Sequence, residues 1–138
     1  MPIYQSQTDS FKVQLLNGQH NFSANTFKIA LYAGNASISN ATTAYTTTGE
    51  VTGTNYTAGG NTLTVNQTPT NDGNVAYISF ANTSWDSSTI SAAGALIYNS
   101  TTGAAVAVLD FGSDKTAGPN FTITFPTADY SSAIIRFS

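Results

Sequence analysis

The chain of 138 residues has the length of one domain and can bury a single hydrophobic core. Its residues are 41% hydrophobic and 12% aromatic but only 8% charged, so Thr, Ser, Asn and Gly must supply most of the polar surface. A net charge of −3 with four Lys and Arg residues excludes a basic stripe for nucleic acid, and the absence of cysteine excludes disulfides and thiolate metal sites.

An extended arm followed by a short helix is expected at the N-terminus. Residues 1–8 are mostly polar, so they form an arm without a core of its own, which a neighbour would have to order. Asp9 or Ser10 is expected to cap the helix, and Gly18 to end it. The apolar residues of this helix are expected to form one stripe, made of Phe11, Val13, Leu15 and Leu16.

Neither export nor membrane insertion is expected. The first ten residues lack the basic and then apolar pattern of a signal peptide. No stretch approaches the roughly 20 apolar residues that cross a bilayer. A soluble protein is therefore expected.

The rest of the chain is expected to be extended. Residues 26–32 alternate for part of their length and predict a strand, whereas residues 33–60 are rich in Thr, Gly and Asn and predict a long connection with one or two edge segments. Further strands are predicted over 61–67, 75–80, 90–98, 104–111, 121–125 and 133–137, with 99–103 as a hairpin loop. The total is seven to nine strands.

Short strands separated by Gly, Asn and Pro turns favour an all-β fold. We expect a β-sandwich or jelly roll of about eight short strands with one short N-terminal helix, because helical patterns between the strands are missing. The arm, residues 1–8, precedes a single domain over residues 9–138. Few charges protect the strand edges, so the arm, the helix or another subunit is expected to cover some of them.

No reactive centre is expected. His20 is the only histidine and has no cysteine to join it in a metal site, which favours a loop or helix-cap role. Glu50 is the only glutamate, and the aspartates lie in or beside turns, where a carboxylate caps backbone N–H groups. No Gly-x-Ser-x-Gly motif accompanies the serines. We expect no catalytic residue, no cofactor and no metal.

Aromatic residues in polar surroundings are the candidates for contact with a partner. Trp85 either folds over the end of the sandwich or forms an exposed anchor for a protein or a sugar. The arm and the connection 36–60 are the segments expected to touch a neighbour. The candidate interface residues are Pro2, Ile3, Tyr4, Tyr45, Val51, Tyr56 and Trp85.

Several blocks of the sequence resemble a set of small structural proteins of tailed bacteriophages. They are DSFK (9–12), HNF (20–22), FKIALY (27–32), ATTAYTTTGE (41–50), YTAGG (56–60), GALIYN (94–99) and VAVLDFG (106–112). The resemblance extends over residues 9–137, and none of the blocks is a catalytic motif.

The resemblance implies a capsid cement, or decoration, protein. Such a β-sandwich sits on the outer surface of the virion capsid, binds the major capsid protein lattice, bridges adjacent capsomers and stabilises the head. Self-association as a dimer or trimer on the shell is expected, without nucleic acid or membrane as a partner.

Two other functions stay open. A tail or adhesin module could bind a host surface glycan through Trp85 and the loop tyrosines. A hydrolase acting on cell wall or exopolysaccharide is suggested only by the many Asp and Ser residues.

Overall fold

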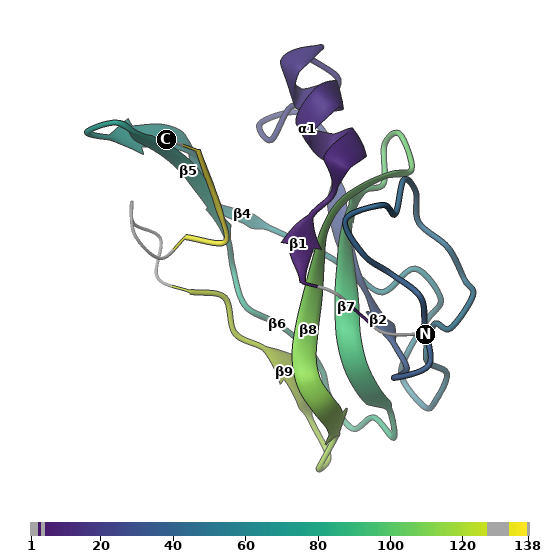
Figure 1. Ribbon diagram of the computed structural model, residues 1–138. Helices are drawn as coiled ribbons and strands as arrows, with labels where there is room; N and C mark the ends of the chain where they lie inside the picture. The colour runs from purple at the N-terminus through teal and green to yellow at the C-terminus, as the bar shows by residue number, and fades with distance from the viewer. Residues whose placement is uncertain (1–2, 4, 127–132, 138) are drawn as a thin grey trace.

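The computed structural model describes residue 3, residues 5–126 and residues 133–137. Over that part of the chain it has one helix and ten strands, arranged in three sheets (Figure 1). In chain order these are β1 (Ser6–Gln7), α1 (Asp9–Leu16), β2 (Phe27–Tyr32), β3 (Asn61–Thr62), β4 (Val65–Asp72), β5 (Val75–Phe80), β6 (Thr83–Trp85), β7 (Ser91–Asn99), β8 (Ala104–Thr116), β9 (Phe121–Ile123) and β10 (Ile135–Phe137).

The largest sheet has five antiparallel strands in the order β1-β8-β7-β2-β3. At its centre β2 pairs with β7, so that Ile29 lies opposite Ile97 and Leu31 opposite Ala95. Both strands are almost entirely buried. That burial explains why their sequences are nearly continuous apolar runs.

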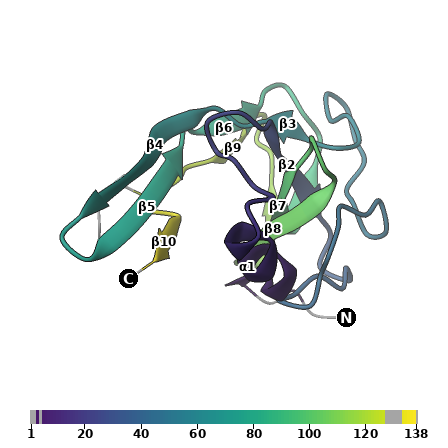
Figure 2. The same cartoon turned by 90° about the horizontal axis from the view of Figure 1, so that it is seen from above.

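The second layer consists of a three-stranded sheet, β10-β5-β4, and a two-stranded sheet, β6-β9. Figure 2 shows the β4–β5 hairpin reaching away from the five-stranded sheet, with β10 beside it. β4 contains Pro69 and forms an edge of its sheet, which is where a strand tolerates a residue without an N–H group.

Both faces of the five-stranded sheet are covered. Successive side chains of a strand point to opposite faces. Ile29 and Leu31 of β2 therefore face one cluster, which includes Phe80 of the second layer. Ala30 and Tyr32 face another cluster, to which the arm contributes Ile3 and the connection contributes Ile38. The connection 33–60 thus covers one face of the sheet (Figure 1).

The predicted all-β sandwich with one short N-terminal helix is confirmed. The predicted strands over 26–32, 75–80 and 90–98 agree with β2, β5 and β7 to within one residue at each end. The run 61–67 divides instead into β3 and the start of β4. β1 and β6 were not predicted, because these polar segments of two and three residues form strands through pairing with β8 and β9.

The N-terminal arm is ordered by its own domain. Ser6 and Gln7 pair with Val108 and Ala107 of β8, and Ile3 forms a parallel bridge with Ile38. The expectation that a neighbouring molecule orders the arm is therefore wrong for its described residues. A sheet edge of the same chain accepts the arm.

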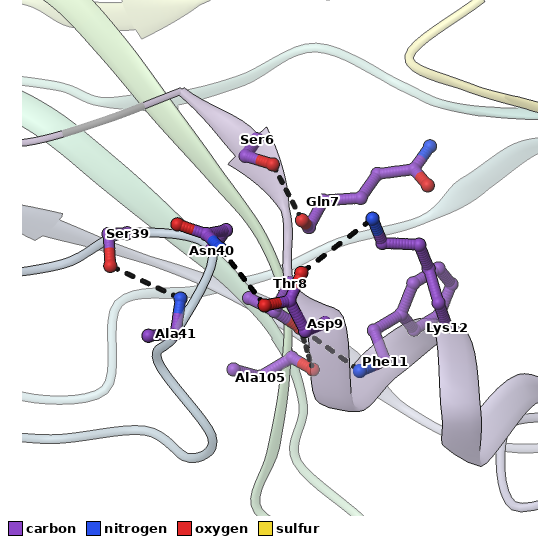
Figure 3. A network of polar contacts seen from close by, with 10 residues as sticks. All are labelled: Ser6, Gln7, Thr8, Asp9, Phe11, Lys12, Ser39, Asn40, Ala41 and Ala105. Carbon is purple, nitrogen blue, oxygen red and sulfur yellow. Dashed lines mark hydrogen bonds and ion pairs between the residues drawn. The ribbon is translucent and has the colours of Figure 1, made fainter.

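Thr8 caps α1, in place of the predicted Asp9 or Ser10 (Figure 3). Its fully buried hydroxyl accepts a hydrogen bond from the Phe11 N–H at 3.1 Å and donates one to the Ala105 carbonyl at 3.2 Å. Asp9 exchanges two hydrogen bonds with Asn40 of the connection. The start of α1 is thereby joined both to β8 and to the connection.

The apolar residues of α1 lie on two faces and not on one stripe. Phe11 is fully buried and Leu15 packs against the core, whereas Val13 is 60% exposed and Leu16 is 90% exposed. Each residue turns the helix by about 100°, which separates the pair Phe11 and Leu15 from the pair Val13 and Leu16. No helix of the described residues is long and apolar enough to cross a membrane.

Candidate functional site

Three of the predicted interface residues are core residues of this chain. Ile3 is 8% exposed, Val51 7% and Trp85 3%, so these side chains leave almost no surface for a partner in this conformation. Ile3 packs where Gly94 has no side chain, since a Cβ there would lie 2.9 Å from the Ile3 Cδ1. Pro2 and Tyr4 lie outside the described residues.

Trp85 folds into the end of the sandwich, which confirms the first of its two predicted positions. Its ring lies 6.2 Å from Phe121 at the end of β9 and 5.9 Å from Tyr56 of the connection. The exposed anchor that suggested glycan binding is therefore absent at Trp85. A sugar stacks on an accessible aromatic face, and this face is packed against protein.

The two remaining candidates, Tyr45 and Tyr56, converge on the carboxylate of Glu50. Tyr45 donates to Oε1 and Tyr56 donates to Oε2, each at 2.5 Å, and the backbone N–H of Gly59 donates to Oε2 at 2.8 Å. Tyr56 Oη also accepts the Leu31 N–H of β2 at 2.9 Å. We call Glu50, Tyr45, Tyr56 and Gly59 the Glu50 cluster.

The five-stranded sheet adds two tyrosines around this cluster. Tyr98 of β7 stacks on Tyr45 with ring centroids 4.6 Å apart and donates to the Gly59 carbonyl at 2.7 Å. Tyr32 of β2 donates to the Thr46 carbonyl at 2.6 Å. The middle of the connection and its C-terminal end are therefore bonded to side chains of the sheet.

The tyrosines around Glu50 stay protonated. Burial, followed by the negative charge of Glu50, raises the pKa of Tyr98 to about 12. Burial and the hydrogen bond to Glu50 raise the pKa of Tyr45 and of Tyr56 even further. Neutral phenols donate to the carboxylate, so Glu50 is occupied in stabilising the connection and Tyr45 and Tyr56 have a structural partner.

The most exposed apolar surface among the described residues lies on α1. Val13 and Leu16 are its large exposed hydrophobic side chains, and we call this pair the α1 ridge. The sequence contains the signal for this ridge. Val13 and Leu16 are three residues apart and share one face of the helix, whereas Phe11 and Leu15 are four residues apart and share a different face. The prediction missed it by joining all four residues into one stripe.

An apolar groove of about 430 Å³ lies beside α1, and we call it the α1 groove. It separates the helix and the loop after it from the β10-β5-β4 sheet. Its lining includes Leu15, Phe22, Pro69, Tyr77, Ile78 and Ile135.

A second groove, of about 590 Å³, lies between β8 and β9. Its lining combines the buried side chains Phe121, Ile123 and Phe125 with Leu109, Phe111 and Ile134, which are half-buried. The α1 groove differs because the exposed ridge adjoins it on the same helix. The ridge is therefore the stronger candidate for contact with a partner.

Within the described ranges, no group of three His, Asp or Glu side chains comes together in a metal-binding arrangement. Comparison of the chain with protein-family models, with curated proteins and with solved structures found no match.

Proposed function

We propose that the protein is a non-enzymatic structural module that binds another protein through the α1 ridge. The observation that carries this proposal is the exposure of Val13 and Leu16 on one face of a helix, at 60% and 90%. The free energy falls when a partner covers large exposed apolar side chains of a folded domain. The partner that we propose is the major capsid protein.

More specifically, we propose that it is a cement protein on the outer surface of a phage head. The sequence resemblance to small structural proteins of tailed phages supports it. The weak net charge of −3 also supports it, because neighbouring copies on a shell, or a dimer or trimer, would repel one another little.

The ridge alone provides a modest contact. Burying a Val or Leu side chain contributes about 1.5–3 kcal/mol, and a dissociation constant of 1 μM corresponds to about 8 kcal/mol. A shell presents many equivalent sites, so self-associated copies gain avidity from weak single contacts. Repetition over a lattice is therefore compatible with a ridge of two residues.

Substitution of the ridge tests this proposal. The double variant Val13→Thr, Leu16→Gln removes apolar area from an exposed helix face, so the fold is expected to persist, as checked by circular dichroism and Trp85 emission. Binding to purified capsids that lack the protein is expected to weaken about tenfold or more, since the loss of apolar burial costs about 2 kcal/mol.

Thr48→Gln in the exposed part of the connection is the matched control and is expected to bind normally. Loss of binding in this control with normal binding of the ridge variant would move the interface to the connection. Failure of the unmodified chain to bind capsids at all would overturn the cement role.

A further inference from the structure

His20 lies at the junction between the end of α1, the loop 17–26 and the β7–β8 hairpin. It is 7% exposed, and its ring packs edge-on against Phe11 at 5.0 Å and tilted over Phe27 at 6.3 Å. It borders the α1 groove and, on its other side, a hollow lined by Gln14 and Thr102. A buried histidine at such a junction must satisfy both of its ring nitrogens.

The hydrogen bonds of His20 require a neutral ring with the proton on Nε2. Nε2 lies 2.9 Å from the Gln14 Oε1, and Nδ1 lies 3.1 Å from the Asn99 Nδ2. The Asn99 amide cannot turn round, because its Oδ1 accepts the Thr101 N–H at 3.0 Å and its Nδ2 also donates to the Asn25 Oδ1 at 3.1 Å. Asn99 is therefore a fixed donor, and Nδ1 must accept.

Protonation of the ring would set two donors against each other. An imidazolium carries N–H groups on both nitrogens, so its Nδ1–H would face the amide hydrogens of the fully buried Asn99. Burial also lowers the pKa of His20, since the charged ring is poorly solvated there. The folded arrangement thus opposes protonation by geometry and by desolvation.

The two ends of α1 are held by different chemistry. At the start, Thr8 bonds to Ala105 and Asp9 bonds to Asn40 (Figure 3). At the end, the His20 ring bridges Gln14 of the helix and Asn99 of the hairpin. Loss of the second attachment would leave the first as a hinge.

We propose that His20, Gln14 and Asn99 form a pH-sensitive lock, and that protonation of His20 releases the last turn of α1 and the loop 17–25 from the sheet. Release would expose Leu15 and Phe22 next to the α1 ridge and so enlarge its apolar surface. The lock acts within one chain, and it holds whether or not the ridge binds a capsid.

The charged groups of α1 and β2 do not compensate a charge on His20. Asp9 and Lys12 are both exposed and pair with each other at 3.7 Å near the start of the helix. Lys28 of β2 extends toward Gly59, where a Cβ would lie 3.3 Å from its Nζ. The loop 17–26 has no other titratable residue.

Strands β5, β7 and β10 carry two tyrosines and one arginine near His20. Tyr77 of β5 lines the α1 groove together with His20, whereas Tyr98 of β7 points to Gly59 on the opposite face of the sheet. Arg136 of β10 is exposed and alternates with Ile135, which faces the groove. His20 is the only histidine of the sequence, so the lock depends on this one imidazole.

Amide hydrogen exchange of the intact chain at pH 7 and pH 5, corrected for intrinsic rates, tests the lock. The opening equilibria of the Asn17, Gly18, Gln19 and Asn25 amides are expected to rise several-fold, with a limit of about tenfold per pH unit for one proton. The amides of Leu96 and Ile97 in β7 are expected to stay protected, which distinguishes local release from global unfolding.

His20→Gln should abolish the rise, because a neutral amide both accepts and donates, and the matched control Tyr77→Phe should keep it. An unchanged opening equilibrium at pH 5, or an equal rise in His20→Gln, would overturn the lock.

If His20→Gln does not fold, an NMR titration of the His20 ring in the unmodified chain tests the lock instead. A pKa below the ordinary value of 6.5 that the α1 amides follow supports the lock, and any other titration overturns it.

Discussion

The Glu50 carboxylate accepts hydrogen bonds from Tyr45, Tyr56 and the Gly59 N–H, and so joins three parts of the connection 33–60. In Glu50→Gln an NH2 group replaces one of the two carboxylate oxygens, so its hydrogens would face at least one of these donors. We expect the free energy of unfolding to fall by about 2 kcal/mol, as for the loss of a bond to a charged group. Urea denaturation followed by Trp85 fluorescence measures this change.

Asp72→Asn is the control for charge, because Asp72 is an exposed carboxylate on the β4–β5 hairpin. Its substitution is expected to change stability by less than about 0.5 kcal/mol. Equal effects of the two substitutions would show that the Glu50 cluster does not stabilise the connection.

Gly60 holds the end of the connection close to β2. Its φ is +78°, and a Cβ on it would lie 1.8 Å from the Ile29 carbonyl oxygen. Gly103 has a similar φ of +84° but open space around it. Gly103→Ala is therefore expected to cost about 1 kcal/mol from backbone strain alone.

Gly60→Ala is expected to cost about 3 kcal/mol or more, because the backbone must also move apart. Thermal denaturation of both variants checks the difference. Similar melting temperatures for the two would mean that the close approach of Gly60 to Ile29 does not exist in solution.

Helix α1 depends on Thr8 for its start. The Thr8 hydroxyl caps the helix and also bonds to the Ala105 carbonyl of β8. Thr8→Ala is expected to lower the free energy of unfolding by about 1–2 kcal/mol. Thr8→Ser keeps the hydroxyl and should retain most of the stability in the same urea titration. A Thr8→Ala variant as stable as the parent would contradict this role.

The strands that sequence predicts are those whose own pattern is decisive. β2 and β7 are almost entirely buried and read as apolar runs, so they were predicted. β1 and β6 have no such pattern and exist only because β8 and β9 pair with them. The apolar pattern within one segment does not show which distant segment it pairs with.

The candidate site follows the same rule. Sequence identified Tyr45 and Tyr56 as aromatics in polar surroundings, but their common partner Glu50 appears only when the connection folds back on itself. Trp85 and Val51 stand among polar neighbours in sequence and are nevertheless buried, because the second layer and the sheet close over them. The polarity of a residue's neighbours in the sequence therefore does not predict whether distant segments bury it.

The five-stranded sheet is covered on one face by the second layer and α1 and on the other by the connection. The arm and the connection, which were expected to contact neighbours, therefore have a role inside the domain. Their outer sides stay polar and exposed, with Thr47 and Thr48 as examples. Among the described residues, the large apolar side chains that stay exposed lie on α1.

The number of copies in purified virions, relative to the major capsid protein, tests the proposed function most directly. Quantitative mass spectrometry of intact particles measures this ratio. A cement protein that occupies every lattice position should approach the copy number of the major capsid protein. A few copies per particle that purify with isolated tails, or none in the virion, would contradict the proposal.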